Sequence, residues 1–382
     1  MRPGKGPGPG LTERRVAEIV RRCYAGLGAD QLQYEVLARL RKVAPVDAAF
    51  FATVDPVTLL FTGAVADDPL GTATPLFLDN EFGQADVNKF AALAAPGAAS
   101  AAGTRITSLD RATRGDRAAS HRYREIMAPL GLGDEVRAAL VAGEHCWGVL
   151  CLHREDSPAG FTDQEIRVVQ QIAPHVAEGL RRAVAAGSGA GTGTGAGRGG
   201  AGGQGGGEPA TPGIIVLDAD LAAVSVSAEA SYWVAELAQL PGSRLGELPV
   251  PVYAAAARLA RAEQQPDPAV LPTVRVRTRG GRWLAVHATR LTGPAGPQTG
   301  VILETASPAQ LSSLFLSAYG LTPAQVRVAG LVLQGYSTRQ ITGQLHISAN
   351  TVQEHLTAVF GKVGVRSRRE LAATLLSGRP RP

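Results

Sequence analysis

Apolar residues recur every three or four positions over the first forty residues. This spacing places them on one face of a helix, so we predict an amphipathic helix from Thr12 and a second helix at 32–43. Aromatic and β-branched residues then fill 48–54 and 59–65, with Asp55-Pro56 between them. Two such runs around a turn dipeptide predict two strands of one sheet.

Helical and strand-like patterns alternate again further along. We predict a helix at 79–93 and a hairpin whose strands are 136–141 and 147–153. Thr162 and Glu165 fit a capping box at the start of a long helix with an apolar stripe. Helices, a sheet and a closing helix together predict an α+β fold for this part of the chain.

Seven short motifs connect this α+β part to a known family. They are FFATVDPVTLLFTGAV, NEF, DVNKF, ATRGD, PLGLGDEVRAALV, CWGVLCLHRE and FTDQEI. Over residues 14–184 the chain resembles a GAF domain of actinobacterial transcription regulators. The resemblance implies a small-molecule-binding or dimerising domain and names no ligand. We therefore expect a GAF-like α/β sensor at 11–186, after a flexible tail at 1–10.

A glycine-rich stretch separates this sensor from the next patterned region. Residues 187–208 are almost entirely Gly, with Ala, Thr and Ser, which predicts a flexible linker with a reach on the order of 25 Å. The pattern at 209–306 resembles a PAS-like α+β domain. Its predicted strands are 213–218, 224–226, 274–277, 283–289 and 299–304, and its predicted helices are 228–240 and 252–262.

Capping signals divide the C-terminal region into short helices. Thr322–Gln325, Ser337–Gln340 and Ser367–Glu370 each fit a capping box. His346-Ile347 is the predicted turn between the second and third helices, and Ser348 can cap the third. Two helices joined by a tight turn, the second with a polar face, are the pattern of a helix-turn-helix DNA reader.

Four motifs extend this pattern to a whole domain. LTPAQ, LVLQGYSTRQI, LHISANTVQEHL and KVGVRSRREL occur in this order. Over 317–380 the chain resembles the all-α, four-helix LuxR-type helix-turn-helix domain. The resemblance implies that Thr351, Gln353, Glu354 and Thr357 face the DNA groove and that the fourth helix is a dimer face. The negative charge of Glu354 is unfavourable near phosphates unless it accepts from a cytosine amino group.

The residue types themselves point to the same surface. Polar side chains near the start of such a helix meet base edges, whereas cations on its flanks meet phosphates. Lys362, Arg366 and Arg368 are the predicted phosphate contacts. The full set predicted to contact DNA is Ser337, Thr338, Asn350, Thr351, Gln353, Glu354, Thr357, Lys362, Arg366 and Arg368.

The distribution of charge along the chain is consistent with a nucleic-acid partner. From Leu311 to the last residue there are eight basic and two acidic residues, whereas the whole chain carries only +5. A basic block of this kind suits a polyanion. We expect double-stranded DNA as the partner, a homodimer on DNA, RNA polymerase as a candidate contact, and an unidentified small-molecule ligand of the GAF-like or PAS-like domain. Without a membrane-length apolar run or a signal core, we expect a cytoplasmic protein that contacts no membrane.

The cysteines leave one alternative function open. Cys146 and Cys151 are five residues apart on one predicted strand, so we expect their side chains to point to opposite faces. A redox enzyme would need an accessible thiol of low pKa, whereas these thiols lie in an apolar strand. His145, His153 and His175 share no ligand spacing. We expect no enzyme, cofactor or metal site; the alternative is a GAF-type redox enzyme with an appended DNA-binding domain.

Overall fold

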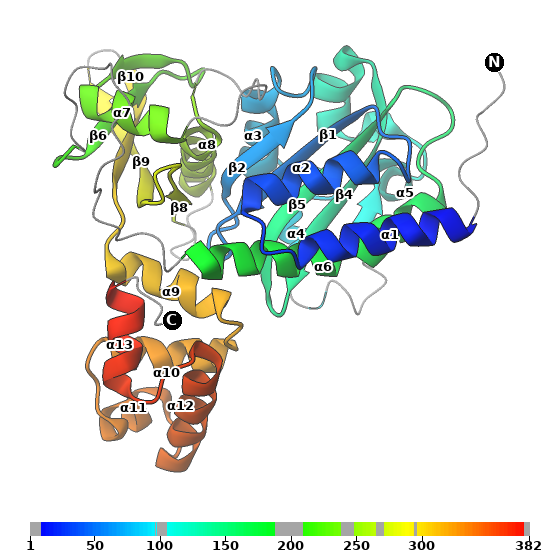
Figure 1. Cartoon of the computed structure of the whole chain (residues 1–382). Coiled ribbons are helices and arrows are strands. Elements are labelled where there is room, and N and C mark those ends of the chain that lie inside the picture. Colours follow the sequence, from blue (N-terminus) through cyan, green and yellow to red (C-terminus); the bar gives the residue numbers. More distant parts are fainter. Residues whose placement is uncertain are drawn as a thin grey trace, which may run out of the picture.

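Two α+β units and one helical unit make up the described part of the chain (Figure 1). This arrangement confirms the multidomain α+β fold class. Among the described residues, no helix is both long and apolar enough to cross a membrane. The predicted tail up to residue 8 and the glycine-rich stretch at 188–208 lie outside the described residues. The computed structural model describes residues 9–95, 97, 105–187, 209–237, 248–264, 271–293 and 296–377.

The first sheet has the strand order β2-β1-β5-β4-β3, and all neighbouring strands are antiparallel. Successive residues of a strand point to opposite faces, so Phe50 enters one hydrophobic core and Phe51 the other. Its strands are β1 (Ala48–Val54), β2 (Phe61–Ala66), β3 (Ile106–Ser108), β4 (Leu132–Ala142) and β5 (His145–Glu155).

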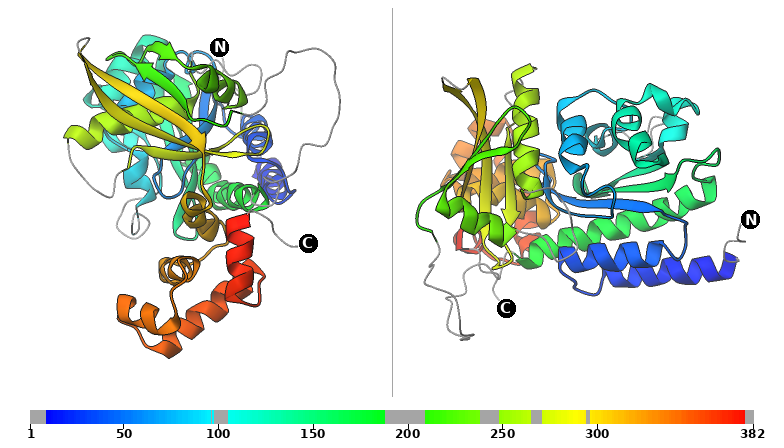
Figure 2. Two further views of the ribbon diagram at one scale, coloured as in Figure 1. Left: turned by 90° about the vertical axis from the view of Figure 1, so that its left-hand side faces the viewer. Right: turned by 90° about the horizontal axis from the view of Figure 1, so that it is seen from above.

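Helices cover both faces of this sheet, with α1, α2 and the long α6 together on one face (Figures 1 and 2). Two glycines permit the close approach of α6. A Cβ on Gly179 would lie 2.7 Å from Leu32 Cδ2, and one on Gly148 would lie 2.6 Å from Leu180 Cδ1. The helices are α1 (Pro9–Cys23), α2 (Ala29–Leu40), α3 (Thr74–Gly83), α4 (Phe90–Ala94), α5 (Leu109–Thr113), η1 (Arg117–Ala119), η2 (Tyr123–Met127), η3 (Ala128–Leu130) and α6 (Asp163–Gly187).

The prediction of one helix at 79–93 is wrong, because a loop separates α3 from α4. Two carboxylates capture backbone N–H groups that a continuous helix would use. Asp86 Oδ1 accepts from the next residue at 2.7 Å, and Glu81 Oε1 accepts from the Phe90 N–H at 2.9 Å. Asn88 has a positive φ of 56°. Side-chain bonds to the backbone therefore replace the helical ladder here.

The prediction that Cys146 and Cys151 point to opposite faces is also wrong. Both thiols lie in the same hydrophobic core. The register of the β4–β5 pair shifts between them, because Leu140 pairs with Gly148 whereas Val141 pairs with Cys146. An extra residue in one strand forms a bulge, which reverses the alternation of side chains.

The second sheet repeats the strand order of the first, as β7-β6-β10-β9-β8, and is likewise antiparallel. Helix α8 packs between this sheet and the first unit, where it contacts α3 and β2 (Figure 2). The helix predicted at 228–240 is described only as far as Leu237. The elements are β6 (Gly213–Leu217), β7 (Ala223–Val226), α7 (Ala228–Leu237), α8 (Val250–Gln264), β8 (Thr273–Arg277), β9 (Trp283–Gly293) and β10 (Gly296–Thr305).

The C-terminal unit contains one helix that the sequence patterns did not predict. Helix α9 (Pro308–Ala318) begins at a capping box in which the Gln310 N–H donates to Ser307 Oγ and the Ser307 N–H donates to Gln310 Oε1. The four predicted helices follow it. They are α10 (Pro323–Leu333), α11 (Thr338–Leu345), α12 (Ala349–Val363) and α13 (Arg368–Ser377).

The structure confirms two of the three predicted C-terminal capping boxes, at Thr322–Gln325 and Ser337–Gln340. The third is only half formed. Ser367 Oγ accepts from the Glu370 N–H at 3.1 Å, but the Glu370 carboxylate accepts from the Arg366 N–H instead of closing the box.

Two continuous hydrophobic cores join the three units. One fills the space between the first sheet, α3, α8 and the second sheet. The other runs from α1, α2 and α6 through α9 into the helical unit, and includes Leu314 and Phe315. Trp283 at the start of β9 packs edge-on against Phe315, with ring centroids 5.7 Å apart. Helix α9 is therefore packed against both upstream units.

Candidate nucleic-acid interface and its attachment

The second and third helices of the C-terminal unit form a tight helix-turn-helix. His346 ends α11 in the left-handed region with φ 53°, and Ser348 Oγ caps α12 by accepting from the Thr351 N–H at 3.1 Å. Val352 and Leu356 on one face of α12 are buried against α10 and α11. The opposite face of α12 consequently points away from the rest of the unit, as Figure 1 shows.

Polar side chains cover that outer face. Asn350, Gln353, Glu354 and Thr357 are exposed, and Thr351 is half-buried. Asn350 Nδ2 donates to Glu354 Oε1 at 2.9 Å. The negatively charged Glu354, which is predicted to face the groove, therefore has a neutral hydrogen-bond donor beside it. The Thr357 hydroxyl donates to the Gln353 backbone carbonyl at 3.0 Å, and the Gln353 side chain is exposed. An exposed glutamine amide can form two hydrogen bonds with adenine.

Two of the three predicted phosphate-binding cations are already engaged inside the unit. Lys362 Nζ donates to the Gly320 carbonyl at 2.8 Å and to Gln325 Oε1 at 2.9 Å. Arg368 donates to the Tyr336 carbonyl at 3.1 Å and to Thr338 Oγ1 at 2.7 Å. These contacts fasten α12 to the start of α10 and α13 to the start of α11.

The positions of the remaining predicted residues are less constrained. Ser337 is the N-cap of α11, and its hydroxyl donates to Gln340 Oε1 at 2.8 Å. Arg366 is exposed, and the described part of the chain records no partner for its guanidinium group. Arg339 on α11 is exposed in the same way and was not among the predicted contacts. A basic residue on the first helix of the motif, which crosses the DNA backbone, is the signal that could have identified it.

One arginine ties the helical unit to both upstream units. Arg275 on β8 donates through Nε to Asp55 Oδ2 at 2.7 Å, and Asp55 directly follows β1 of the first sheet. Its Nη1 donates to the Gln310 carbonyl at 2.8 Å and to Ser313 Oγ at 2.7 Å, both on α9. Asp55 is 1% exposed and Arg275 is 6% exposed. A single buried guanidinium therefore contacts the first sheet, the second sheet and α9.

A second contact reaches α9 at its C-terminal end. Arg181 near the end of α6 donates to the Ala318 carbonyl at the end of α9, and the same guanidinium pairs with Glu178 at 2.7 Å. The first unit thus contacts α9 directly, independently of the chain segment at 188–208. Because α9 leads into the helix-turn-helix, these contacts link its position to the state of the upstream units.

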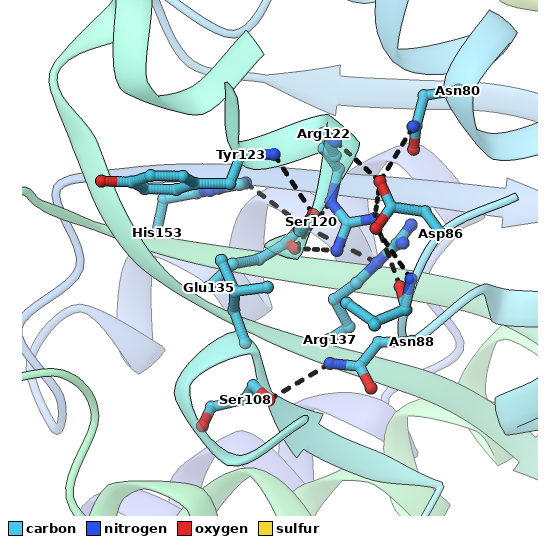
Figure 3. Close-up of polar contacts among 12 residues, drawn as sticks. Asn80, Asp86, Asn88, Ser108, Ser120, Arg122, Tyr123, Glu135, Arg137 and His153 are labelled. Atoms are coloured by element: carbon cyan, nitrogen blue, oxygen red, sulfur yellow. Dashed lines mark hydrogen bonds and ion pairs between the residues drawn. The ribbon is translucent and has the colours of Figure 1, made fainter. Parts of the chain in front are cut away.

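A buried ionic network lies inside the first unit, between its sheet and α3 (Figure 3). Arg122 Nε donates to Glu135 Oε2 at 2.9 Å, and Arg137 Nη2 donates to Glu81 Oε2 at 2.6 Å. The Arg137 guanidinium also stacks 3.8 Å from the centre of the Phe90 ring. Burial raises the pKa of the Glu135 carboxyl, but the two arginine charges outweigh burial and hold that pKa at about 2.

His153 makes the first unit sensitive to acid. Burial and the arginine charges lower the pKa of His153 to about 4, against about 6.5 in an unfolded chain. The neutral ring is the form that fits the fold, so its contribution is complete above pH 6.5 and is lost as the pH falls towards 4. We expect a loss of about 3 kcal/mol over this window. Urea unfolding at pH 7, 5.5 and 4.5 measures it, and His153→Leu should flatten the slope. An equal slope in the variant would contradict the assignment.

The same network contains three groups with metal-ligand chemistry. Glu135, Cys151 and His153 place one ligand atom each within 4.8 Å of one another, and all three residues are buried. However, Arg122 already bonds the Glu135 carboxylate, and Arg137 Nε lies 3.7 Å from it. A divalent cation at this point would face two fixed positive charges, so the donor set does not favour one.

The thiols lie in surroundings that suppress reactivity. Burial raises the pKa of Cys146 to about 12, that of Cys23 to about 11 and that of Cys151 well above its ordinary value. Only the thiolate is a strong nucleophile. We therefore expect no thiol of the native chain to react with a disulfide reagent at pH 7.5 over minutes, and all three to react in denaturant. Rapid labelling of Cys146 or Cys151 in the native chain would contradict this.

Two regions of the chain match known protein families. Residues 320–375 match the family described as "Bacterial regulatory proteins, luxR family", and residues 28–180 match the GAF domain. These matches confirm the GAF domain and the LuxR-type helix-turn-helix domain inferred from the sequence motifs. The first corresponds to the first sheet with its helices, and the second to the unit that holds α10 to α13.

Curated relatives share only a short segment with this chain. The HTH-type transcriptional regulator MalT of Klebsiella pneumoniae is 38% identical over 50 residues, which is 13% of this chain and 6% of the relative. A putative HTH-type transcriptional regulator of Mycobacterium bovis is 45% identical over 51 residues, again 13% and 6%. The matched segment thus spans about 6% of the length of these relatives.

Solved structures show only weak similarity. The GAF domain of an Acinetobacter phosphoenolpyruvate-protein phosphotransferase has a TM-score of 0.29 at 11% identity, covering 46% of this chain and 96% of that chain. A Vibrio cholera VqmA-ligand-DNA complex gives 0.23 at 17% identity, covering 45% and 84%. TM-scores this low carry no argument about function.

Proposed function

We propose that this chain, which joins a GAF domain to a C-terminal helix-turn-helix domain of the luxR family of bacterial regulatory proteins, is a sequence-specific DNA-binding transcription regulator. The observation that carries the proposal is the exposed polar face of α12, which includes Gln353 and the hydrogen-bonded pair Asn350–Glu354. A helix that packs with one face and presents hydrogen-bonding side chains on the other fits the major groove.

The affinity for DNA depends on which basic side chains are free to contact phosphates. Lys362 and Arg368 hold the helices of the unit together, so most phosphate contacts fall to exposed arginines such as Arg366 and Arg339. Ser337 and Thr338 lie at the start of α11, where the helix dipole favours a phosphate, although the Ser337 N–H itself is bonded to Gln340 Oε1. Few free cations in one unit favour binding as a homodimer, which doubles the contacts on one DNA site.

The upstream units supply control. The GAF domain and the second sheet both contact α9 through Arg275 and Arg181, so a change in their packing moves the helix that carries the DNA-binding unit. The second unit is a PAS-like domain in this proposal, supported by its five-stranded antiparallel sheet and flanking helices. Leu371 and Leu375 are buried within the chain, so a dimer through α13 uses the rest of its surface. RNA polymerase is a candidate partner, and the cytoplasm is the location.

A redox enzyme is the second candidate, and the thiol environments argue against it. Cys146 and Cys151 are buried at 3% and 0% exposure, in surroundings that raise the pKa of each thiol. A nucleophilic thiol needs a low pKa and access to its substrate. The regulator is therefore the better-supported function.

Two substitutions in the full chain test the DNA-binding assignment. Gln353→Ala should weaken binding to the selected duplex by about 1–3 kcal/mol, because it removes a contact to a base edge. The variant should also discriminate less between bases at that one position. Arg366→Ala should weaken binding to every sequence about equally and reduce the salt slope by about one. Fluorescence anisotropy with duplexes selected from a random pool measures both effects.

Lys362→Ala is the matched control for charge. Because its ammonium group bonds Gly320 and Gln325, its main expected effect is a lower melting temperature of the helical unit. If selection enriches no sequence at all, or if Gln353→Ala leaves the enriched sequence unchanged, the assignment of α12 as the reading helix fails.

A further inference from the structure

A cleft of about 360 Å³ lies where α8 meets the GAF domain. The GAF domain contributes Val54, Glu81, Lys89 and Val149, among others, and α8 contributes Arg258 and Arg261. This volume falls in the range of small-molecule sites, roughly 300–1,000 Å³. Because its walls come from two units, the cleft exists only while α8 is docked on the GAF domain.

The described core of the GAF domain beneath α3 is filled. Phe50, Phe77 and the Arg122 guanidinium line a cavity of only about 10 Å³ beneath α3. The rings of Phe50 and Phe77 pack with centroids 4.8 Å apart. The cavity beneath α3 is therefore too small for a ligand of more than a few atoms, whereas the cleft at α8 has room for one.

Cations outnumber carboxylates among the residues that line the cleft, three to two. Both acidic side chains of the cleft already accept hydrogen bonds from the GAF domain. Glu81 accepts from Arg137 at 2.6 Å, and Asp86 accepts from the Arg122 backbone N–H at 2.6 Å. The three cations that line the cleft are Lys89, Arg258 and Arg261.

Arg258 keeps unused hydrogen-bonding capacity. In the described part of the chain its one recorded bond is a long one, from Nη2 to the Thr58 carbonyl at 3.4 Å, and its Nε has no partner. Its guanidinium lies 5.2 Å from the centre of the Phe82 ring, which orients it without satisfying its N–H groups. A guanidinium group with free N–H donors can form two parallel hydrogen bonds with a carboxylate.

Lys89 supports the same chemistry from the other wall. Its ammonium donates to the Gln84 carbonyl at 2.9 Å and to the Asn80 carbonyl. Burial lowers the pKa of Lys89 to about 8, and a bound anion would favour its charged form. Val54, Leu59 and Phe82 add apolar surface to the same cleft.

We propose that the cleft between α8 and the GAF domain binds a small organic carboxylate with an apolar body, held by Arg258 with Lys89 and Arg261. The bound anion bridges cations of both units and so stabilises the docking of α8. This inference deepens the sensing part of the proposed function, and its test involves no DNA, so either can fail without the other.

Isothermal titration calorimetry of the full chain tests the proposal with benzoate, phenylacetate and hexanoate, and with the neutral amide of each as control. We expect saturable binding of at least one carboxylate, together with a rise in melting temperature, and at least tenfold weaker binding of its amide. No saturable binding of any carboxylate, or equal binding of the amides, would overturn the proposal.

Variants locate the site. Arg258→Gln should weaken carboxylate binding at least tenfold, Arg258→Lys should retain part of it, and Arg167→Gln on the exposed face of α6 should leave it unchanged. The partial rescue by lysine separates loss of charge from loss of folding. Binding by Arg258→Gln within twofold of the unmodified chain, or an equal loss in Arg258→Lys and Arg258→Gln, would overturn the assignment to this cleft.

Discussion

Replacing Arg275 with methionine is expected to release α9 from the upstream units, at a cost of about 3–5 kcal/mol. The substitution leaves the Asp55 carboxylate buried at 1% exposure without its charged partner, and removes both bonds to α9. An uncompensated buried charge is far more costly than a lost surface pair. Hydrogen exchange of the α9 amides in the full chain measures the loss, and protection should fall by about two to three orders of magnitude.

Arg290→Met is the matched control within the same sheet. Arg290 pairs with Glu263, but the two side chains are 32% and 41% exposed, so the expected cost is below about 1 kcal/mol. The double variant Asp55→Leu with Arg275→Met should cost less than the sum of the two single changes, because each single change leaves a partner unpaired. Equal α9 exchange in Arg275→Met and Arg290→Met would contradict the role given to Arg275.

Arg137→Met is expected to destabilise the GAF domain by a similar amount, about 3–5 kcal/mol. Arg137 is fully buried, and its guanidinium is the partner of Glu81 and a neighbour of Glu135. Methionine fills most of the volume but leaves Glu81 without its cation. Urea unfolding followed by the fluorescence of Trp147, which is buried in this unit, measures the change.

A second substitution distinguishes charge from packing. Adding Glu81→Met to Arg137→Met removes the stranded carboxylate and should recover part of the lost stability, because replacing both partners of a buried pair is often nearly neutral. If Arg137→Met lowers stability by less than about 1 kcal/mol, the network does not hold the domain together in the way its geometry implies.

Local signals in the sequence were sufficient for most elements. Capping boxes at Thr322–Gln325 and Ser337–Gln340 fixed the ends of helices because the cap is a bond between residues three apart. Strand runs and the two hairpins were equally visible. Helix α9 was not predicted, although Ser307 and Gln310 form the same motif, because α9 lies almost entirely before residues 317–380, the range that resembles a LuxR-type domain.

Long-range geometry was not predictable in the same way. The bulge that brings Cys146 and Cys151 to one face depends on how β5 pairs with β4, and no local pattern encodes it. The Asp55–Arg275 contact joins residues 220 positions apart. Likewise, Lys362 and Arg368 looked like free phosphate contacts in the sequence, and only the fold shows their bonds to Gly320 and Tyr336.

The measurement that most directly tests the proposed function is a salt titration of DNA binding by the full chain. The duplex enriched by selection and a scrambled duplex of the same composition are compared between 50 and 200 mM salt. We expect at least about a hundredfold preference for the selected duplex, with both affinities falling as salt rises because phosphate contacts release counterions. Equal affinity for the two duplexes at every salt concentration would contradict a sequence-reading role for α12.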